Sequence, residues 1–284
     1  MRPERRGKRA AQSAPPARGE TPPARGETRL RRFEGAALRG VWRYEAAQFT
    51  RYWKPQTFGA LFEPAFMLLA FGYGVGSLVA AVAGITYRDF VATGVVGTAA
   101  LFLSVFPAMF NGYTRRVFQH TYDAVLAAPV DLHELLAGET VWTAARAGVF
   151  GSAPLLVGMA FGLDPAPGML LVPFIVFATA FGLSLFGAWT AARVASINSL
   201  DYVITGVVTP LMLVAGTYFP MSSLPGWAQA AAHANPVFHC VELVRHAVFG
   251  FRPLADLGHL AGIAAFAAVA WTLALRALRR KLIV

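Results

Sequence analysis

The sequence predicts an all-α polytopic membrane protein with six transmembrane helices, and both its composition and its apolar runs support that class. Of the 284 residues, 56% are hydrophobic and 14% are charged, whereas about 25% of the residues in a typical soluble domain are charged. A helix needs roughly 20 mostly apolar residues to cross the hydrocarbon core of a bilayer. Six segments meet that length, at approximately 58–83, 89–110, 138–162, 168–194, 198–217 and 255–276.

The net charge of +10 is concentrated before the first apolar segment and after the last one. This distribution is typical of the cytoplasmic face of a membrane protein. We therefore expect these positive residues to interact with the lipid bilayer and not with a nucleic acid. Cys240 is the only cysteine, so no internal disulfide can form.

Residues 1–35 are predicted to form a disordered, basic tail rich in Arg and Pro. The tail contains a tandem heptad, PPARGET, from Pro15 to Thr21 and again from Pro22 to Thr28. No apolar stretch follows the early arginines soon enough for a secretory signal, so we expect the tail to stay on the mature protein. It either binds anionic lipid headgroups or is a plain solvated extension. Residues 36–284 are predicted to form the membrane domain.

The stretch over residues 36–54 is predicted to form an amphipathic helix at the membrane interface. It is too charged to span a bilayer, because aromatic residues alternate with positive ones along it. The aromatic residues are Trp42, Tyr44, Phe49, Tyr52 and Trp53, and the positive ones are Arg39, Arg43, Arg51 and Lys54.

The loop charges predict that both termini are cytoplasmic, because positive residues gather on the cytoplasmic side of membrane proteins. The short turns near Gly84 and Pro165 have almost no positive charge and are assigned to the outer side. The positive residues assigned to the cytoplasmic side are Arg115, Arg116, Arg193, Arg276, Arg279, Arg280 and Lys281.

The longest polar interruption between two apolar segments runs from Asn111 to Gly138. Two arginines are followed by a helix-like run with one apolar side, which comprises Phe118, Tyr122 and Val125, and Pro129 ends the run. We expect a short amphipathic helix here that contacts a soluble partner on the cytoplasmic side.

The segment from Tyr218 to Pro253 is too polar to cross a membrane and too apolar for a free loop. Its prolines and its Asn235-Pro236 turn predict two short helices that form a hairpin in the outer leaflet. Such helices satisfy their own backbone hydrogen bonds within lipid. Trp227 is expected at the level of the lipid headgroups.

The lysines argue against ATP binding by this chain. Lys8, Lys54 and Lys281 are the only three, and none lies in a glycine-rich phosphate-binding turn. If ATP provides the energy, another polypeptide binds the ATP and its Mg²⁺, and this chain needs no cofactor.

His239, Glu242 and His246 are spaced so that a helix would place them on one face. They are the strongest candidates for a metal or catalytic site, but no HExxH motif is present. Amphipathic helices at an interface often have such residues on their wet face. We therefore predict no metal site, and we expect Glu242 and Arg245 to orient the hairpin or to line an outer vestibule.

Glu63, Arg146 and Asp201 are ionisable residues within or near the ends of predicted spans. Exposure of such groups to lipid is costly, so each is expected to have a partner or to face water. Glu63 and Asp201 lie close enough to the cytoplasmic ends to reach water. Arg146 lies deeper, and we expect its side chain either to form an ion pair or to extend to the interface by snorkelling.

Several short motifs are individually loose but jointly specific. They are Phe71–Gly76, Gly138-Glu139 with Trp142, Gly216–Pro220, Leu224-Pro225, Asn235-Pro236 and Val241–Arg245. Together with the order of the elements, they resemble the permease subunit of type 2 ATP-binding-cassette exporters. The similarity is greatest to the branch with the nodulation lipo-oligosaccharide and daunorubicin exporters, and it runs from about Ala36 to the C-terminus.

The resemblance implies that two permeases pair with two cytosolic ATPases; we expect the two permeases to form a homodimer, and a heterodimer is the alternative. The resemblance also implies that a coupling helix in the loop after the second span docks into a groove on the ATPase. On this sequence the coupling helix is expected over Thr114 to Ala128. Its contact residues are expected to be Arg115, Arg116, Phe118, Tyr122 and Asp123.

We therefore expect a permease that moves an amphiphilic molecule, such as a lipid-linked saccharide, a lipid or a hydrophobic drug, out across a bacterial inner membrane. A separate ATPase subunit would power it, and the chain itself would not be an enzyme. Two other classes stay open: a membrane-embedded enzyme with a His/Glu site at its outer face, and a non-transporting scaffold that recruits a soluble protein.

Overall fold

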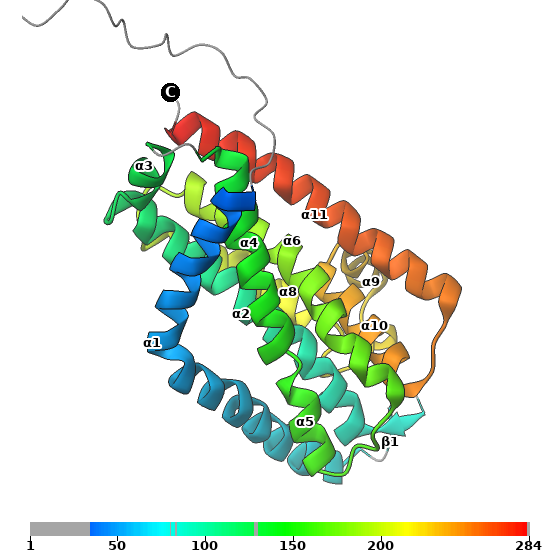
Figure 1. Ribbon diagram of the computed structural model, residues 1–284. Coiled ribbons are helices and arrows are strands. Elements are labelled where there is room, and N and C mark those ends of the chain that lie inside the picture. Colours follow the sequence, from blue (N-terminus) through cyan, green and yellow to red (C-terminus); the bar gives the residue numbers. More distant parts are fainter. Residues whose placement is uncertain (1–34, 80, 83, 128–129, 283–284) are drawn as a thin grey trace, which may run out of the picture. The chain divides into compact units, whose positions relative to one another are not determined.

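The computed structural model describes residues 35–79, 81–82, 84–127 and 130–282, and over these residues the fold is almost entirely helical (Figure 1). The tail predicted over residues 1–35 lies outside the described residues, except for Gly35, where the first helix begins. The α-helices are α1 (Gly35–Met67), α2 (Tyr87–Val117), α3 (Thr121–Leu126), α4 (Leu132–Phe150), α5 (Ala153–Ala160), α6 (Val172–Arg193), α7 (Ser199–Val203), α8 (Thr209–Leu213), α9 (Gly226–Ala232), α10 (Pro236–Phe249) and α11 (Pro253–Leu282).

Shorter elements connect these helices. Two π-helical segments are η1 (Leu68–Gly74) and η4 (Ile204–Val208), and three 3₁₀ turns are η2 (Val75–Ser77), η3 (Pro167–Leu171) and η5 (Met221–Ser223). The strands β1 (Ala81–Val82) and β2 (Ile85–Thr86) pair antiparallel in a small hairpin.

The helix α2 is the one around which the others pack, and it contacts α4, α6 and α10. Its most apolar stretch is 72% buried inside the described chain. Small residues make this packing close. A Cβ added at Gly94 would lie 2.4 Å from the carbonyl oxygen of Thr217, and one at Gly187 of α6 would lie 2.7 Å from the Cβ of Ala108. Glycine is therefore required at both contacts.

Among the described residues, four helical stretches are long and apolar enough to cross a membrane: Arg39–Ser77, Tyr87–Val117, Pro167–Arg193 and Pro253–Leu282. They correspond to the first, second, fourth and sixth predicted spans. The all-helical, multi-span class is thus confirmed, whereas the third and fifth predicted spans do not form single helices that are both long and apolar enough.

The predicted interfacial helix and the first predicted span lie in one continuous helix, and the location of its first part at the membrane interface stays a prediction. α1 runs unbroken from Gly35 to Met67 and continues through η1 and η2 to Ser77, before the β-hairpin. Pro55 and Pro64 lie inside α1, and Figure 1 shows the helix bending along its length. A proline removes a helical hydrogen bond and can kink a helix without ending it.

The third predicted span, 138–162, is divided. α4 begins earlier, at Leu132, because Asp131 and Glu134 form a capping box there. The helix is then interrupted at Gly151 and Ser152, before α5. In place of the fifth predicted span, 198–217, the segments α7, η4 and α8 form a shorter apolar helix over Ser199–Leu213.

The prediction of one helix over Thr114 to Ala128 is wrong. α2 extends to Val117, and α3 begins only at Thr121, after a turn. His120, at this turn, has a φ of 50°, a left-handed conformation that does not continue a helix. Ala128 lies outside the described residues. The polar loop is therefore a corner between α2 and α3.

The segment between Tyr218 and Pro253 forms two short helices, α9 and α10, as predicted. The side chain of Asn235 accepts a hydrogen bond from the backbone N–H of Val237 and so caps α10. One face of α10 belongs to the core, because Val237, Cys240 and Val241 are fully buried. α10 packs against α2 and α6 and is therefore part of the helical core.

Two ends of the bundle can be distinguished in Figure 1. The α3 end contains α3 and the end of α11, where the side chains of His133 and Arg279 are in contact. The hairpin end contains the β-hairpin, the end of α5 and the start of α11.

Candidate functional site

At the α3 end, Tyr122 anchors the short helix α3 to α4. Its side chain is buried, and its hydroxyl donates a hydrogen bond of 2.7 Å to Oε2 of Glu139. Burial raises the pKa of Tyr122 well above its ordinary value, and the neighbouring Glu139 raises that pKa further. The phenol therefore stays protonated at neutral pH and remains a hydrogen-bond donor to Glu139.

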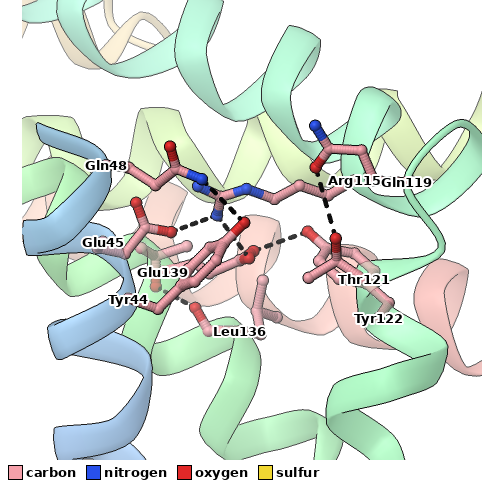
Figure 2. Close-up of polar contacts among 10 residues, drawn as sticks. Tyr44, Glu45, Gln48, Arg115, Gln119, Thr121, Tyr122, Leu136 and Glu139 are labelled. Carbon is pink, nitrogen blue, oxygen red and sulfur yellow. Dashed lines mark hydrogen bonds and ion pairs between the residues drawn. The ribbon is translucent and has the colours of Figure 1, made fainter. Parts of the chain in front are cut away.

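Arg115, in the last turn of α2, lies at the centre of this site (Figure 2). Its Nη1 forms ion pairs with Oε1 of Glu139, at 2.9 Å, and with Oε1 of Glu45. The guanidinium also lies over the ring of Tyr44, 5.2 Å from its centroid. The three charged side chains are only 11% to 18% exposed. Charges this far removed from water require partners, so the arginine and both carboxylates depend on one another.

We call Glu45, Arg115, Tyr122 and Glu139 the Arg115 cluster. Each member comes from a different helix: α1, α2, α3 and α4 respectively. Figure 2 shows these side chains pointing toward one another from the separate ribbons. A displacement of α3 relative to α4, or of α2 relative to α1, must therefore break a buried polar contact or move the neighbouring helix with it.

The carboxylates of Glu45 and Glu139 were missed as site residues at the sequence level. Glu45 is the only acidic residue between Ala36 and Lys54, and Glu139 lies at the start of the predicted third span. An acidic residue beside an apolar segment requires a cation, and that signal could have marked both. The sequence does not indicate that the two share one arginine.

Arg116 also points into the protein. Its Nη2 donates a hydrogen bond of 2.6 Å to the carbonyl oxygen of Ala191 on α6, and its guanidinium lies 5.6 Å from the ring centroid of Tyr113. Neither arginine of this corner is thus a free surface charge. Direct contact of Arg115 and Arg116 with a partner stays a prediction.

Other residues form the exposed face of the corner. Phe118 is 62% exposed, and Nδ1 of His120 lies 3.2 Å from Oδ2 of Asp123. We call the exposed set the α3 surface; it comprises Phe118, Gln119, His120, Asp123 and Ala124. An exposed aromatic ring with polar neighbours is a composition common at protein–protein contacts.

At the other predicted site, the structure joins Glu242 and Arg245. Nη1 of Arg245 lies 3.1 Å from Oε1 of Glu242, and its Nη2 donates a hydrogen bond of 2.7 Å to the carbonyl oxygen of Gly216. The guanidinium also lies 3.7 Å from the ring centroid of Phe90 on α2. Burial lowers the pKa of Arg245 to about 10, against the opposing effect of Glu242. Trp227 is largely exposed on α9.

The histidines of α10 pair with the start of α11. Nδ1 of His239 lies 2.9 Å from Nδ1 of His259, and Nδ1 of His246 lies 2.5 Å from Oδ1 of Asp256. Within the described part of the chain, no group of three or more His, Cys, Asp or Glu side chains is arranged to hold a metal ion. These contacts link the two helices to each other.

The three ionisable residues predicted in or near the spans lie in different surroundings. Glu63 and Asp201 are exposed, on α1 and α7 respectively. Nη1 of Arg146 donates a hydrogen bond of 3.0 Å to Oε1 of Gln56 on α1. Because α1 begins at Gly35, Glu63 lies well inside a helix and not near its start.

Comparisons with known proteins agree with the sequence motifs. A family model described as ABC-2 type transporter matches residues 37–249, which is more than half of the chain. The chain is 28% identical over 244 residues to Nodulation protein J of Sinorhizobium fredii, covering 86% of this chain and 93% of that protein. It is 27% identical over 243 residues to Nodulation protein J of Rhizobium meliloti, covering 85% of this chain and 92% of that protein.

A relative outside the nodulation proteins covers the same part of the chain. The Inner membrane transport permease YadH of Escherichia coli is 24% identical over 241 residues, covering 84% of this chain and 94% of that protein. The matched region contains the Arg115 cluster, the α3 surface and the helices α9 and α10. The resemblance found in the sequence is confirmed, and the chain belongs to the ABC-2 type transporter family as a membrane permease subunit, not as an enzyme.

Proposed function

We propose that this permease exports an amphiphilic molecule, such as a lipid-linked saccharide, a lipid or a hydrophobic drug, outward across the bacterial inner membrane. Family membership implies an ATPase partner. In this proposal ATP and Mg²⁺ bind to that cytosolic partner, because the lysines of this chain do not lie in a phosphate-binding turn. The similarity to an inner membrane transport permease supports the choice of membrane, and the outward direction rests on the resemblance to the exporter family.

The proposed topology has six spans and both termini in the cytoplasm. α4 with α5 and the segment Ser199–Leu213 would be the third and fifth spans. The ends of α2, α6 and α11 all have basic residues in the last turn, which supports a cytoplasmic location for the α3 end. The helices α9 and α10 would then lie on the outer side, between the last two spans.

The observation that supports coupling best is the Arg115 cluster. A partner that moves the α3 surface displaces α3, and Tyr122 passes that displacement to Glu139 of α4. Arg115 then connects Glu139 to Glu45 of α1. Rigid helices joined by buried polar contacts transmit rigid-body displacements. The α3 surface is the proposed docking site, and the Arg115 cluster is the proposed transmission element.

The proposed second copy would cover α1. The most apolar stretch of this helix is only 17% buried in the described chain, and its exposed aromatic residues include Phe58, Phe62 and Phe66. The exposed side of Ser199–Leu213, with Tyr202, is a second candidate for the dimer seam. α2 offers less free surface, because most of it is buried within the chain.

Two variants separate docking from transmission. Phe118→Ala removes the exposed ring of the α3 surface, so we expect less ATPase to co-purify with the permease. Tyr122→Phe keeps that surface but removes the hydrogen bond to Glu139, so the ATPase should still bind. With Tyr122→Phe, proteoliposomes with both subunits and a fluorescent lipid should move less lipid for each ATP hydrolysed.

Phe174→Ala is the matched control, because Phe174 is a similarly exposed phenylalanine, at 71%, near the start of α6. It should co-purify as much ATPase as the unmodified protein. Equal co-purification by Phe118→Ala and Phe174→Ala would rule out the docking site. Unchanged lipid movement per ATP in Tyr122→Phe would rule out the transmission element. A permease that binds the ATPase but moves no amphiphile under any condition would be a scaffold.

A further inference from the structure

A cavity of about 440 Å³ lies beside the Arg115 cluster, between α1, α2, α4 and α6. This volume falls within the range of roughly 300–1,000 Å³ that small-molecule sites occupy. The Arg115 cluster forms part of its wall. Apart from Gln119 of the α3 surface, the rest of the wall belongs to residues that the proposed coupling does not use.

Arg146 lines the cavity from α4 and forms no ion pair with a carboxylate of the described residues, although Glu45 attracts it over a longer distance. Its Nη1 donates to the neutral amide of Gln56, and its buried Nε has no hydrogen-bond partner among the described residues. The two carboxylates of the cavity, Glu45 and Glu139, are already engaged by Arg115. Arg146 is therefore a cation of this cavity with hydrogen-bonding capacity left for a ligand.

Apart from the charged side chains of the Arg115 cluster, of which Glu45 and Arg115 act electrostatically on Arg146, the polar groups that line this cavity are neutral. Gln48 and Gln56 from α1, Asn111 from α2 and Thr143 from α4 line the same cavity. Amides and hydroxyls donate hydrogen bonds to an anion without repelling it. A guanidinium among neutral donors suits an anion with several oxygens, and phosphate matches the planar fork of arginine well.

The rim of the cavity indicates how such an anion arrives. Phe49 and Trp142 line the cavity, with ring centroids 6.5 Å apart, and Tyr52 lines it as well while being 62% exposed. Aromatic side chains of this kind gather at the level of lipid headgroups. A lipid could therefore place its headgroup among the polar groups and leave its acyl chains outside.

We propose that this cavity binds the phosphate-bearing headgroup of an amphiphile from the bilayer, with Arg146 as its principal anion contact. This binding does not depend on coupling to an ATPase, so its test needs only the purified permease. Free inorganic phosphate shares the same chemistry and is a separate arm of the test.

The experiment measures binding of dihexanoyl phosphatidylglycerol to the full-length protein in detergent by native mass spectrometry or calorimetry. Dihexanoylglycerol, which lacks the phosphate, and inorganic phosphate are the comparison ligands. Arg146→Gln removes the cation, and we expect it to weaken phosphatidylglycerol binding about tenfold or more. The unmodified protein should bind dihexanoylglycerol more weakly than dihexanoyl phosphatidylglycerol, by a similar factor.

Gln56→Glu keeps Arg146 in place and offers it a carboxylate at the position of the present amide oxygen. It should weaken phosphatidylglycerol binding while leaving thermal stability equal or higher, so the test holds even if Arg146→Gln fails to fold. Arg193→Gln removes an exposed arginine from the end of α6, and it should change binding by less than about twofold.

Three results would overturn the proposal. The first is equal phosphatidylglycerol binding by Gln56→Glu and the unmodified protein. The second is a loss in Arg193→Gln as large as that in Gln56→Glu, which would indicate nonspecific attraction to positive charge. The third is inorganic phosphate binding as tightly as the lipid, which would assign the cavity to the free anion.

Discussion

Replacing Arg115 by methionine tests whether the buried cluster is one electrostatic unit. The change leaves the carboxylates of Glu45 and Glu139, which are 11% and 18% exposed, without their cation. Removing one partner of a buried ion pair costs about 3–5 kcal/mol of unfolding free energy. Glu45→Gln costs less, about 1.5–3 kcal/mol for one charge-assisted hydrogen bond, because Arg115 keeps its 2.9 Å contact with Glu139.

The decisive measurement is the thermal midpoint of the two single variants and of the double variant in detergent. At about 2–4 °C for each kcal/mol, Arg115→Met should lower the midpoint by about 6–20 °C. Glu45→Gln should then stabilise the Arg115→Met protein, because it removes an unpaired buried carboxylate, although it destabilises the unmodified protein. This change of sign reports direct coupling between the two side chains. A Glu45→Gln effect of the same sign and size in both backgrounds would refute the reasoning.

Two further predictions concern packing and pH. Gly94→Ala should destabilise the protein by about 1–3 kcal/mol, because the added Cβ would lie 2.4 Å from the carbonyl oxygen of Thr217. Gly258→Ala on α11 is the control, because its Cβ meets no atom within 4 Å. It should be neutral or stabilising in the same thermal assay. Burial lowers the pKa of His239 below its ordinary value, so the unfolded chain takes up a proton before the native protein does. The contribution of His239 to the unfolding free energy should therefore be complete at neutral pH and decrease as the pH drops through about 6.5. His239→Gln should flatten that pH dependence of the thermal midpoint, and an unchanged slope would contradict the assignment.

Local sequence signals predicted many elements of this fold. The length of the apolar runs indicated a multi-span helical protein, and four of the predicted spans lie in stretches of sufficient length. The Asn235-Pro236 pair predicted the start of α10, because asparagine caps a helix and proline suits its first turn. Proline is a weaker signal in this chain, because Pro55 and Pro64 both lie inside α1 without ending it.

The sequence by itself determined the membrane class and the family motifs, because composition and short motifs are local properties; the side of the bilayer that it assigns to the basic residues stays a prediction. Only the tertiary structure decided that Arg115 turns inward and joins Glu45, 70 positions away, to Glu139. It also decided that α10 is part of the core and that Arg146 lines a cavity in which, among the described residues, its side chain donates to the amide of Gln56 and forms no ion pair. Such pairings depend on which faces of distant helices meet, and hydrophobic periodicity specifies that a face is buried without specifying the helix that buries it.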